Sequence, residues 1–153
     1  MDVESWLHPD NADSRPALLL GQQLAELPAL RSATRHWPAG TIQQAQLRLA
    51  AVQNLPTRGF GRCLIADPLP ADGAAEADAV LARVRDLLAE RVLVITHNQD
   101  ALATRLQALG YRILGRTHDQ LAAGFDIHDY KHCPTWLNAR HWANPQLWDQ
   151  FRW

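Results

Sequence analysis

Alternation between short apolar runs and amphipathic stretches constrains the fold of this chain more than any other feature. Val92–Ile95 is an uninterrupted run of leucine and β-branched residues, typical of a strand covered on both faces. In the preceding stretch, Ala75–Glu90, apolar residues recur at the spacing of a helix that packs on a sheet. These residues are Val80, Leu81, Val84, Leu87 and Leu88. Strand–helix–strand units of this kind form parallel sheets with right-handed crossovers, so the sequence predicts an α/β fold with flanking helices.

Other segments extend this pattern along the chain. Strands are expected at Ala17–Leu20, Thr41–Val52, Arg62–Ala66, Arg112–Leu114 and Ala123–Ile127. Thr41–Val52 is ambiguous, because glutamine, alanine and arginine dominate it and also tolerate a helix. One helix is expected at Leu24–Arg35. Another is expected between Asn98, which can cap its start, and Gly110, which supplies a left-handed stop.

Length and composition narrow the class of protein. The 153 residues fit a single domain, 1–153, with a core at residues 15–130 and a C-terminal tail at residues 131–153. The net charge of −1 argues against a nucleic-acid partner, which normally requires clustered lysine and arginine. No apolar run approaches the roughly 18 residues of a membrane span. Residues 1–5 lack the features of a secretory signal, and Cys63 and Cys133 are expected to be reduced, so a cytoplasmic protein is predicted.

The tail is rich in tryptophan, whereas the rest of the chain is poor in aromatic residues. It holds Trp136, Trp142, Trp148 and Trp153, and two short helices are expected there at Pro134–Trp142 and Pro145–Phe151. One interpretation is that these rings cover the edge of the sheet and complete the core. The other is that Trp136–Trp153 forms a surface for a protein partner or a homodimer, because exposed tryptophan clusters mark interfaces.

A specific motif begins just before the tail. It reads His128-Asp129-Tyr130-Lys131, then Pro134, Trp136-Leu137-Asn138, Trp142-Ala143-Asn144-Pro145 and a closing Trp153. This segment resembles the C-terminus of an uncharacterised bacterial family that is similar to class I methyltransferases with a shortened core. Over the first 120 residues the similarity is in the order of elements, with Ala17–Gly21 as first strand, Arg62–Asp67 as fourth and Arg91–His97 as fifth. The resemblance implies a Rossmann-like, mostly parallel sheet whose last strand is antiparallel, and it brings no known activity.

The usual devices for holding S-adenosylmethionine are degenerate in this sequence. Such sites place a glycine-rich turn after the first strand and an acidic residue after the second. The turn here is Gly21-Gln22-Gln23-Leu24, with one glycine, and the second candidate strand is followed by Gln53 and Asn54. Asp67-Pro68-Leu69-Pro70 faintly resembles the Asp-Pro-Pro-aromatic loop of amino-group methyltransferases, but a strand-terminating turn explains it better. No cofactor is therefore expected, although S-adenosylmethionine stays possible.

A pocket, if one exists, belongs at the carboxyl ends of the parallel strands, where ligands of open α/β sheets bind. Candidate cofactor-binding residues at this rim are Gly21, Gln22, Asp67, His97 and Asn98, and the candidate catalytic residues among them are Asp67 and His97. If the last strand is antiparallel, His128 and Asp129 emerge at the opposite rim. The two polar groups would then not form one site.

Other groups of residues are weaker candidates for metal binding or catalysis. His128, His132, Cys133 and His141 match no standard zinc spacing, so no metal is expected. His128 and Asp129 could form an oriented base, or a turn in which Asp129 accepts backbone donors and pairs with Lys131. The sequence lacks a nucleophile elbow and a phosphate-binding loop. Cys63 lies in an apolar strand and is expected to be an inert core thiol.

Two functional hypotheses follow. The first is a degenerate methyltransferase-like domain that acts as a binding or protein-interaction module. The second is a working methyltransferase with an atypical cofactor loop at Gly21–Leu24 and with Asp67 and His97 near the reacting centre. A roomy cleft over Gly21 would favour the enzyme, whereas a cleft filled by Gln22, Gln23 or Arg58 would favour the binding module.

Overall fold

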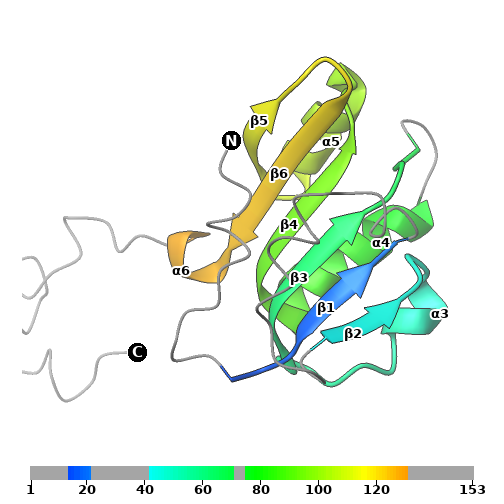
Figure 1. Cartoon of the computed structure of the whole chain (residues 1–153), viewed down its shortest axis with the longest axis vertical. Coiled ribbons are helices and arrows are strands. Elements are labelled where there is room, and N and C mark those ends of the chain that lie inside the picture. Colours follow the sequence, from blue (N-terminus) through cyan, green and yellow to red (C-terminus); the bar gives the residue numbers. More distant parts are fainter. Residues whose placement is uncertain (1–13, 22–41, 71–74, 131–153) are drawn as a thin grey trace, which may run out of the picture.

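The fold is seen in a computed structural model that describes residues 14–21, 42–70 and 75–130. Within these ranges the strands are β1 (Ala17–Leu20), β2 (Ile42–Ala45), β3 (Phe60–Ala66), β4 (Ala89–His97), β5 (Arg112–Arg116) and β6 (Gln120–Asp126). The helices are α3 (Leu49–Val52), α4 (Ala75–Arg83), the π-helix η2 (Val84–Leu88), α5 (Asp100–Ala108) and α6 (Ile127–Tyr130). Figure 1 shows them as one twisted sheet with helices beside it. In the described residues, no helix has both the length and the apolar character needed to span a lipid bilayer.

The described strands form one mixed sheet in the order β2-β1-β3-β4-β6-β5. Strands β2, β1, β3 and β4 are parallel, and β6 is antiparallel to both β4 and β5. The prediction of a mostly parallel α/β sheet with an antiparallel last strand is therefore confirmed. The chain leaves β1 to one side for β2 and returns to the other side for β3. This reversal makes β1 and β3 the topological switch point, where ligands of open α/β sheets bind.

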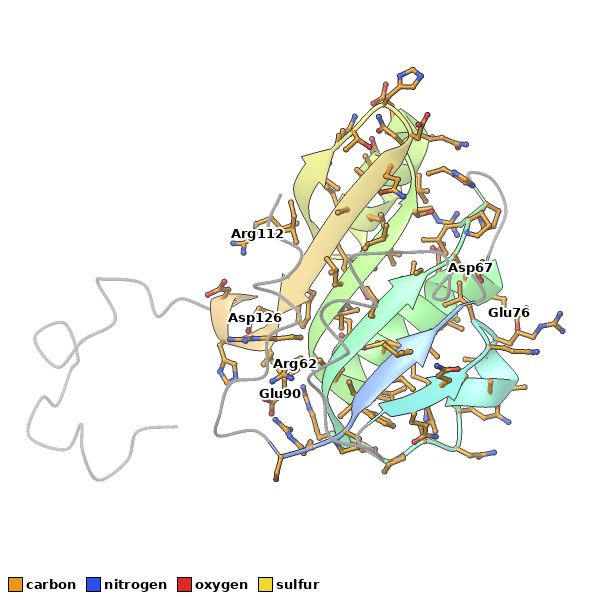
Figure 2. All side chains as sticks on the ribbon, viewed as in Figure 1. Arg62, Asp67, Glu76, Glu90, Arg112 and Asp126 are labelled. Atoms are coloured by element: carbon orange, nitrogen blue, oxygen red, sulfur yellow. The ribbon has the colours of Figure 1, made fainter. Side chains whose placement is uncertain are left out.

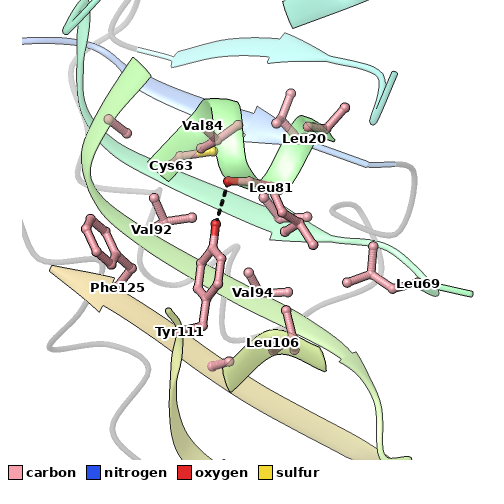
Figure 3. Close-up of a cluster of buried hydrophobic side chains, with 14 of the residues drawn as sticks. Leu20, Cys63, Leu69, Leu81, Val84, Val92, Val94, Leu106, Tyr111 and Phe125 are labelled. Carbon is pink, nitrogen blue, oxygen red and sulfur yellow. Dashed lines mark hydrogen bonds between the residues drawn. The ribbon is translucent and has the colours of Figure 1, made fainter. Parts of the chain in front are cut away.

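The core lies between the sheet and helices α4, η2 and α5. Every second residue of the central strands contributes to it, because side chains alternate between the two faces of a strand. Its members include Leu18 and Leu20 of β1, Cys63 and Ile65 of β3, and Val92 and Val94 of β4 (Figure 3). Residues on the other face, such as Leu19, Leu64 and Leu93, are buried as well. The central strands are thus covered on both faces, as the continuous apolar run in β4 predicts.

The helix before β4 ends earlier than the sequence predicts and changes its winding. Ala75–Glu90 was expected to be one helix, but α4 passes into a π-helix at Val84, and Ala89 and Glu90 already belong to β4. Ala89 pairs with Phe60, so the start of β4 is set by the early start of β3. A π-helix takes more residues per turn. The change of winding accounts for Leu87 being 38% exposed instead of sharing the buried face of Leu88.

Several other boundaries differ from the predictions. The ambiguous segment Thr41–Val52 divides into β2 and the short helix α3. The last strand runs from Gln120 to Asp126, not from Ala123 to Ile127, because β6 pairs with β4 along its whole length. The predicted helices Leu24–Arg35, Pro134–Trp142 and Pro145–Phe151 lie outside the described residues.

The prediction that Asn98 caps the next helix is wrong. Gln99 occupies the N-cap position of α5 without a side-chain hydrogen bond. The Asn98 side chain instead donates to the carbonyl oxygen of Thr117 at 2.7 Å, and its backbone N–H donates to that of Asp119 at 3.0 Å. Asn98 therefore ties the end of β4 to the turn between β5 and β6. The left-handed stop at Gly110 is confirmed by its φ of 84°.

Candidate functional site

The predicted rim forms at the carboxyl ends of the parallel strands. Gly21 follows β1, Asp67 follows β3, and His97 is the last residue of β4. Gly21 and Asp67 are neighbours, since a Cβ atom placed on Gly21 would lie 3.1 Å from Cβ of Asp67. His97 lies farther along, because Ala66 of β3 pairs with Ile95 of β4. Gln22 is outside the described residues.

Gly21 is a glycine because the neighbouring strand leaves no room for a side chain. Its φ of 112° is in the region that disfavours other residues, and a Cβ atom would lie 2.2 Å from the carbonyl oxygen of Ala66. Its N–H donates to the carbonyl oxygen of Ala45 at 3.3 Å. The residue therefore holds the end of β1 closely against the ends of β2 and β3. The fold alone requires glycine here.

Asp67 begins a turn that fixes the loop after β3 to the next strand. Two residues on, the N–H of Leu69 donates to Oγ1 of Thr96 at 3.0 Å, and both residues are buried. The interpretation of this segment as a strand-terminating turn therefore agrees with the structure. Asp67 itself lies just after β3 (Figure 2). It is partly buried, and this burial raises the pKa of its carboxyl group above the ordinary value. A raised pKa on a carboxyl group at a switch point is a feature of functional sites.

The other two rim candidates offer less chemistry. His97 is exposed at the end of β4. The side chain of Asn98 is engaged with Thr117, and its backbone N–H with Asp119. Of the predicted rim residues that the structure describes, Gly21 and Asp67 are brought together, whereas His97 and Asn98 belong to the far end of β4 and the β5–β6 turn.

The position for a ribose-binding acid also differs from the prediction. Strand β2 ends at Ala45, so the residue in question is Gln46, which is exposed, and not Gln53 or Asn54, which follow α3. A glutamine replaces the carboxylate at this point. Arg58 precedes β3, and its N–H donates to the carbonyl oxygen of Leu87 at 2.6 Å. It therefore lies at the amino edge of the sheet, opposite the edge where Gly21 lies.

A group of charged residues gathers at the opposite, amino edge of the sheet. The guanidinium of Arg15 donates to both carboxylate oxygens of Glu90, at 2.9 and 2.7 Å, and Nε2 of His128 lies 3.5 Å from Glu90. The hydrogen bonds from Arg15 lower the pKa of Glu90, although partial burial acts in the other direction. Because β6 runs antiparallel to β4, the expectation that His128 and Asp129 emerge at the rim opposite Asp67 is correct.

The turn at His128 is built differently from the prediction. The backbone N–H of His128 donates to Oδ1 of Asp126 at 2.8 Å, so Asp126 caps α6, and its Oδ2 accepts from Nε of Arg91 at 2.8 Å. In the part of the chain that the structure describes, Asp129 pairs with Arg112 at 3.4 Å. Lys131, the expected partner of Asp129, lies outside the described residues.

A hollow of about 180 Å³ opens beside this turn. It is lined by Gly110, Arg112, Gly124, Phe125, Asp126 and Asp129, from the start of β5, the end of β6 and α6. Sequence reasoning identified Asp129 but missed Arg112 and Gly124. These two residues are far apart along the chain and meet because they pair across β5 and β6. Asp129 is the only predicted motif residue among the lining residues in the part of the chain described.

The candidate residues for metal binding and thiol chemistry are only partly covered by residues 14–21, 42–70 and 75–130. Within these ranges no three or more histidine, cysteine, aspartate or glutamate side chains form a group that could hold a metal ion. His132, Cys133 and His141 fall outside them, as do the motif residues Lys131, Trp136, Asn138, Trp142 and Asn144. Cys63 is buried in the core, and burial raises the pKa of its thiol, which keeps it protonated.

Comparison with known proteins places the chain in a family. The family described as "Family of unknown function (DUF6231)" matches residues 3–153. No curated protein matches the sequence. Among solved structures, the DszA carbon methyltransferase is similar with a TM-score of 0.48 and 12% identity, over 78% of this chain and 49% of that one. A SAM-dependent methyltransferase from Aquifex aeolicus is similar with a TM-score of 0.44 and 10% identity, over 71% and 80% of the two chains. This chain thus spans about half the length of the first of these structures.

Proposed function

The chain belongs to this family of unknown function, DUF6231, and we propose that its domain is a binding module built on a methyltransferase-like sheet. On this proposal the domain recognises a ligand or a protein partner and does not transfer methyl groups. The S-adenosylmethionine site that such a sheet would carry at its carboxyl edge is degenerate. The proposal also holds that a partner or a second copy of the chain binds at Trp136–Trp153, which lies outside the described residues.

The contact between Gly21 and Ala66 carries this proposal. In dinucleotide-binding turns, the absence of a glycine side chain lets the ligand approach the backbone. Here the corresponding space is occupied by the carbonyl group of Ala66, 2.2 Å from where a Cβ atom would stand. The glycine therefore serves contact between strands, and its presence is no sign of a ligand. Gln46 adds support, because a neutral amide stands where a ribose-binding carboxylate would be expected.

One observation favours the second candidate, an S-adenosylmethionine-dependent methyltransferase. Asp67 lies at the switch point, beside Gly21, with a raised pKa and with its loop fixed by the hydrogen bond from Leu69 to Thr96. A carboxyl group held in this way could accept a proton from a substrate amine or hydroxyl group. Asp67 would then be the catalytic residue, and His97 would line the same edge.

Titration calorimetry separates the two candidates. The full-length protein is titrated with S-adenosylmethionine and with its demethylated product. The binding module predicts no heat at millimolar ligand, whereas an enzyme would bind at about micromolar concentration, near −8 kcal/mol. Asp67→Asn is the test variant if binding is found, and Asp119→Asn, an exposed carboxyl group in the β5–β6 turn, is the control. Gly21 is unsuitable as a binding probe, because a larger residue there would disturb the strands themselves.

The partner surface needs a separate measurement. Sedimentation equilibrium of the full-length chain shows whether it self-associates. If a dimer forms, alanine substitutions at Trp136 and Trp148 should weaken it, whereas a dimer that withstands both substitutions would contradict the placement of the interface in the tail. A chain that is monomeric up to about 0.1 mM, a concentration that would populate complexes of micromolar affinity, would direct the search to other proteins.

A further inference from the structure

Two of the residues that line the hollow at the amino edge are glycines, Gly110 and Gly124. Gly110 precedes β5 and has a φ of 84°, which explains its identity by conformation. Gly124 lies inside β6, where it pairs with Leu93 on one side and Arg112 on the other. A glycine within a strand weakens the strand and often marks a place where a ligand approaches the backbone. Strand formation alone therefore does not explain why residue 124 is a glycine.

The charges around the hollow balance one another. The charged residues that line it are Arg112, Asp126 and Asp129. Arg112 pairs with Asp129, and Asp126 pairs with Arg91. A ligand with a single charge that replaced the contact between Arg112 and Asp129 would leave one of these two groups without an opposite charge beside it. A ligand that carries one positive and one negative charge would preserve the balance.

The two ion pairs differ in how readily they can exchange partners. Asp126 is 11% exposed, and its two oxygens are occupied by Arg91 and by the N–H of His128. Arg112 and Asp129 are 64% and 50% exposed, and their closest atoms are 3.4 Å apart. Such a long, solvent-exposed pair contributes little to stability. Arg112 and Asp129 are therefore the groups that can turn toward a ligand at small cost.

We propose that this hollow binds a free amino acid with a small side chain. Its carboxylate would accept hydrogen bonds from the guanidinium of Arg112, and its ammonium group would donate to the carboxylate of Asp129. The side chain would rest against Gly110 and Gly124. Arginine suits the carboxylate because its fork of N–H groups matches the two oxygens.

The size of the hollow agrees with this ligand class. Its volume is about 180 Å³. An apolar cavity of about 150 Å³ accommodates benzene, which has six heavy atoms. Alanine also has six heavy atoms, so the hollow is large enough to hold it. This site is separate from the carboxyl edge, so the inference does not depend on whether S-adenosylmethionine binds there.

Nuclear magnetic resonance of the full-length protein tests the proposal with three matched probes. L-alanine carries both charges, ethylamine lacks the carboxylate, and propionate lacks the ammonium group. The amide signals of Gly110 and Gly124 report on the hollow. We expect L-alanine to shift both signals in a saturable way and to bind at least about tenfold more tightly than either control, since each control loses a charge-assisted hydrogen-bonding group.

Variants show whether the ion pair is responsible. Arg112→Gln and Asp129→Asn should each weaken alanine binding by about tenfold or more, because each removes one charged partner of the ligand. Arg116→Gln is the matched control, since Arg116 lies at the other end of β5 and pairs with Asp100. Amide signals of Gly110 and Gly124 that stay unshifted at millimolar L-alanine would overturn the inference. Equal binding of propionate or ethylamine would also overturn it, as would an equal loss of alanine binding in the Arg116→Gln control.

Discussion

The hydroxyl group of Tyr111 donates a hydrogen bond to the carbonyl oxygen of Leu81 at 2.9 Å, inside the core (Figure 3). This bond joins the residue before β5 to helix α4, two parts of the chain that are separated by all of β4 and α5. The ring of Tyr111 also meets Phe125 of β6 in an edge-to-face contact, with centroids 6.3 Å apart. Tyr111 therefore connects α4, β5 and β6, and burial raises the pKa of its hydroxyl group so that it remains a donor.

Replacing Tyr111 by phenylalanine tests this connection. The variant keeps the ring and loses the donor, which leaves the Leu81 carbonyl oxygen with one partner fewer in the core. We expect the free energy of unfolding to fall by about 1–2 kcal/mol. Chemical denaturation at constant pH measures the change, with an unchanged denaturant slope as the check that the denatured state is the same. A variant as stable as the wild type would show that the bond contributes nothing net.

Two glycine substitutions should lower the free energy of unfolding by different amounts. Gly21→Ala should destabilise the protein by more than about 2 kcal/mol, because the new Cβ atom meets the backbone of Ala66 as well as an unfavourable φ. Gly110→Ala has an unfavourable φ too, but its nearest neighbour is the end of the Arg85 side chain, which can move. We expect about 1 kcal/mol there. Urea denaturation of both variants gives the comparison, and equal costs would contradict the account of Gly21.

Glu90 should make stability depend on pH. Its pKa in the folded protein lies below the ordinary value of 4.5, because Arg15 stabilises the carboxylate. The contribution of the Glu90 carboxylate to the stability of the folded protein is therefore present above pH 4.5, and it is lost as the pH falls through the lowered pKa. We expect Glu90→Gln to be less stable than the wild type by about 0.5–1 kcal/mol at neutral pH. The difference should shrink as the pH falls below 4.5. Asp119→Asn, at an 85% exposed side chain, is the control.

Asp67 should affect the pH dependence of stability in the opposite direction to Glu90. Burial raises the pKa of its carboxyl group above 3.8. The contribution of Asp67 to the stability of the folded protein is therefore favourable at low pH, and it is lost as the pH rises through the raised pKa. Asp67→Asn removes this loss of stability, because asparagine does not ionise. We expect its melting temperature at pH 7 to exceed that of the wild type by about 1–3 °C. Below pH 3.8 the two proteins should melt together. A less stable variant at pH 7 would mean that the ionised carboxylate makes a favourable contact.

The sequence predicts those parts of the fold that depend on local patterns. The central strands β1, β3 and β4 follow from apolar runs, and the stop at Gly110 follows from glycine chemistry. The early start of β4 depends on the pairing of Ala89 with Phe60, which a local pattern does not contain. The same holds for the site. The rim residues at strand ends could be named from the sequence, whereas the hollow at Arg112 and Gly124 depends on the register of two strands.

The insertion of β6 between β4 and β5 sets an order for folding during synthesis. Strand β4 spans nine largely apolar residues, and its outer edge pairs only with β6 among the described strands. Strand β5 is made earlier than β6 yet pairs with no other described strand, so it must wait for its partner. A nascent chain that ends before Asp126 therefore presents the unpaired edge of β4, the kind of edge that promotes aggregation. The ribosome must therefore deliver β6, the last of the described strands, before this edge of β4 is covered.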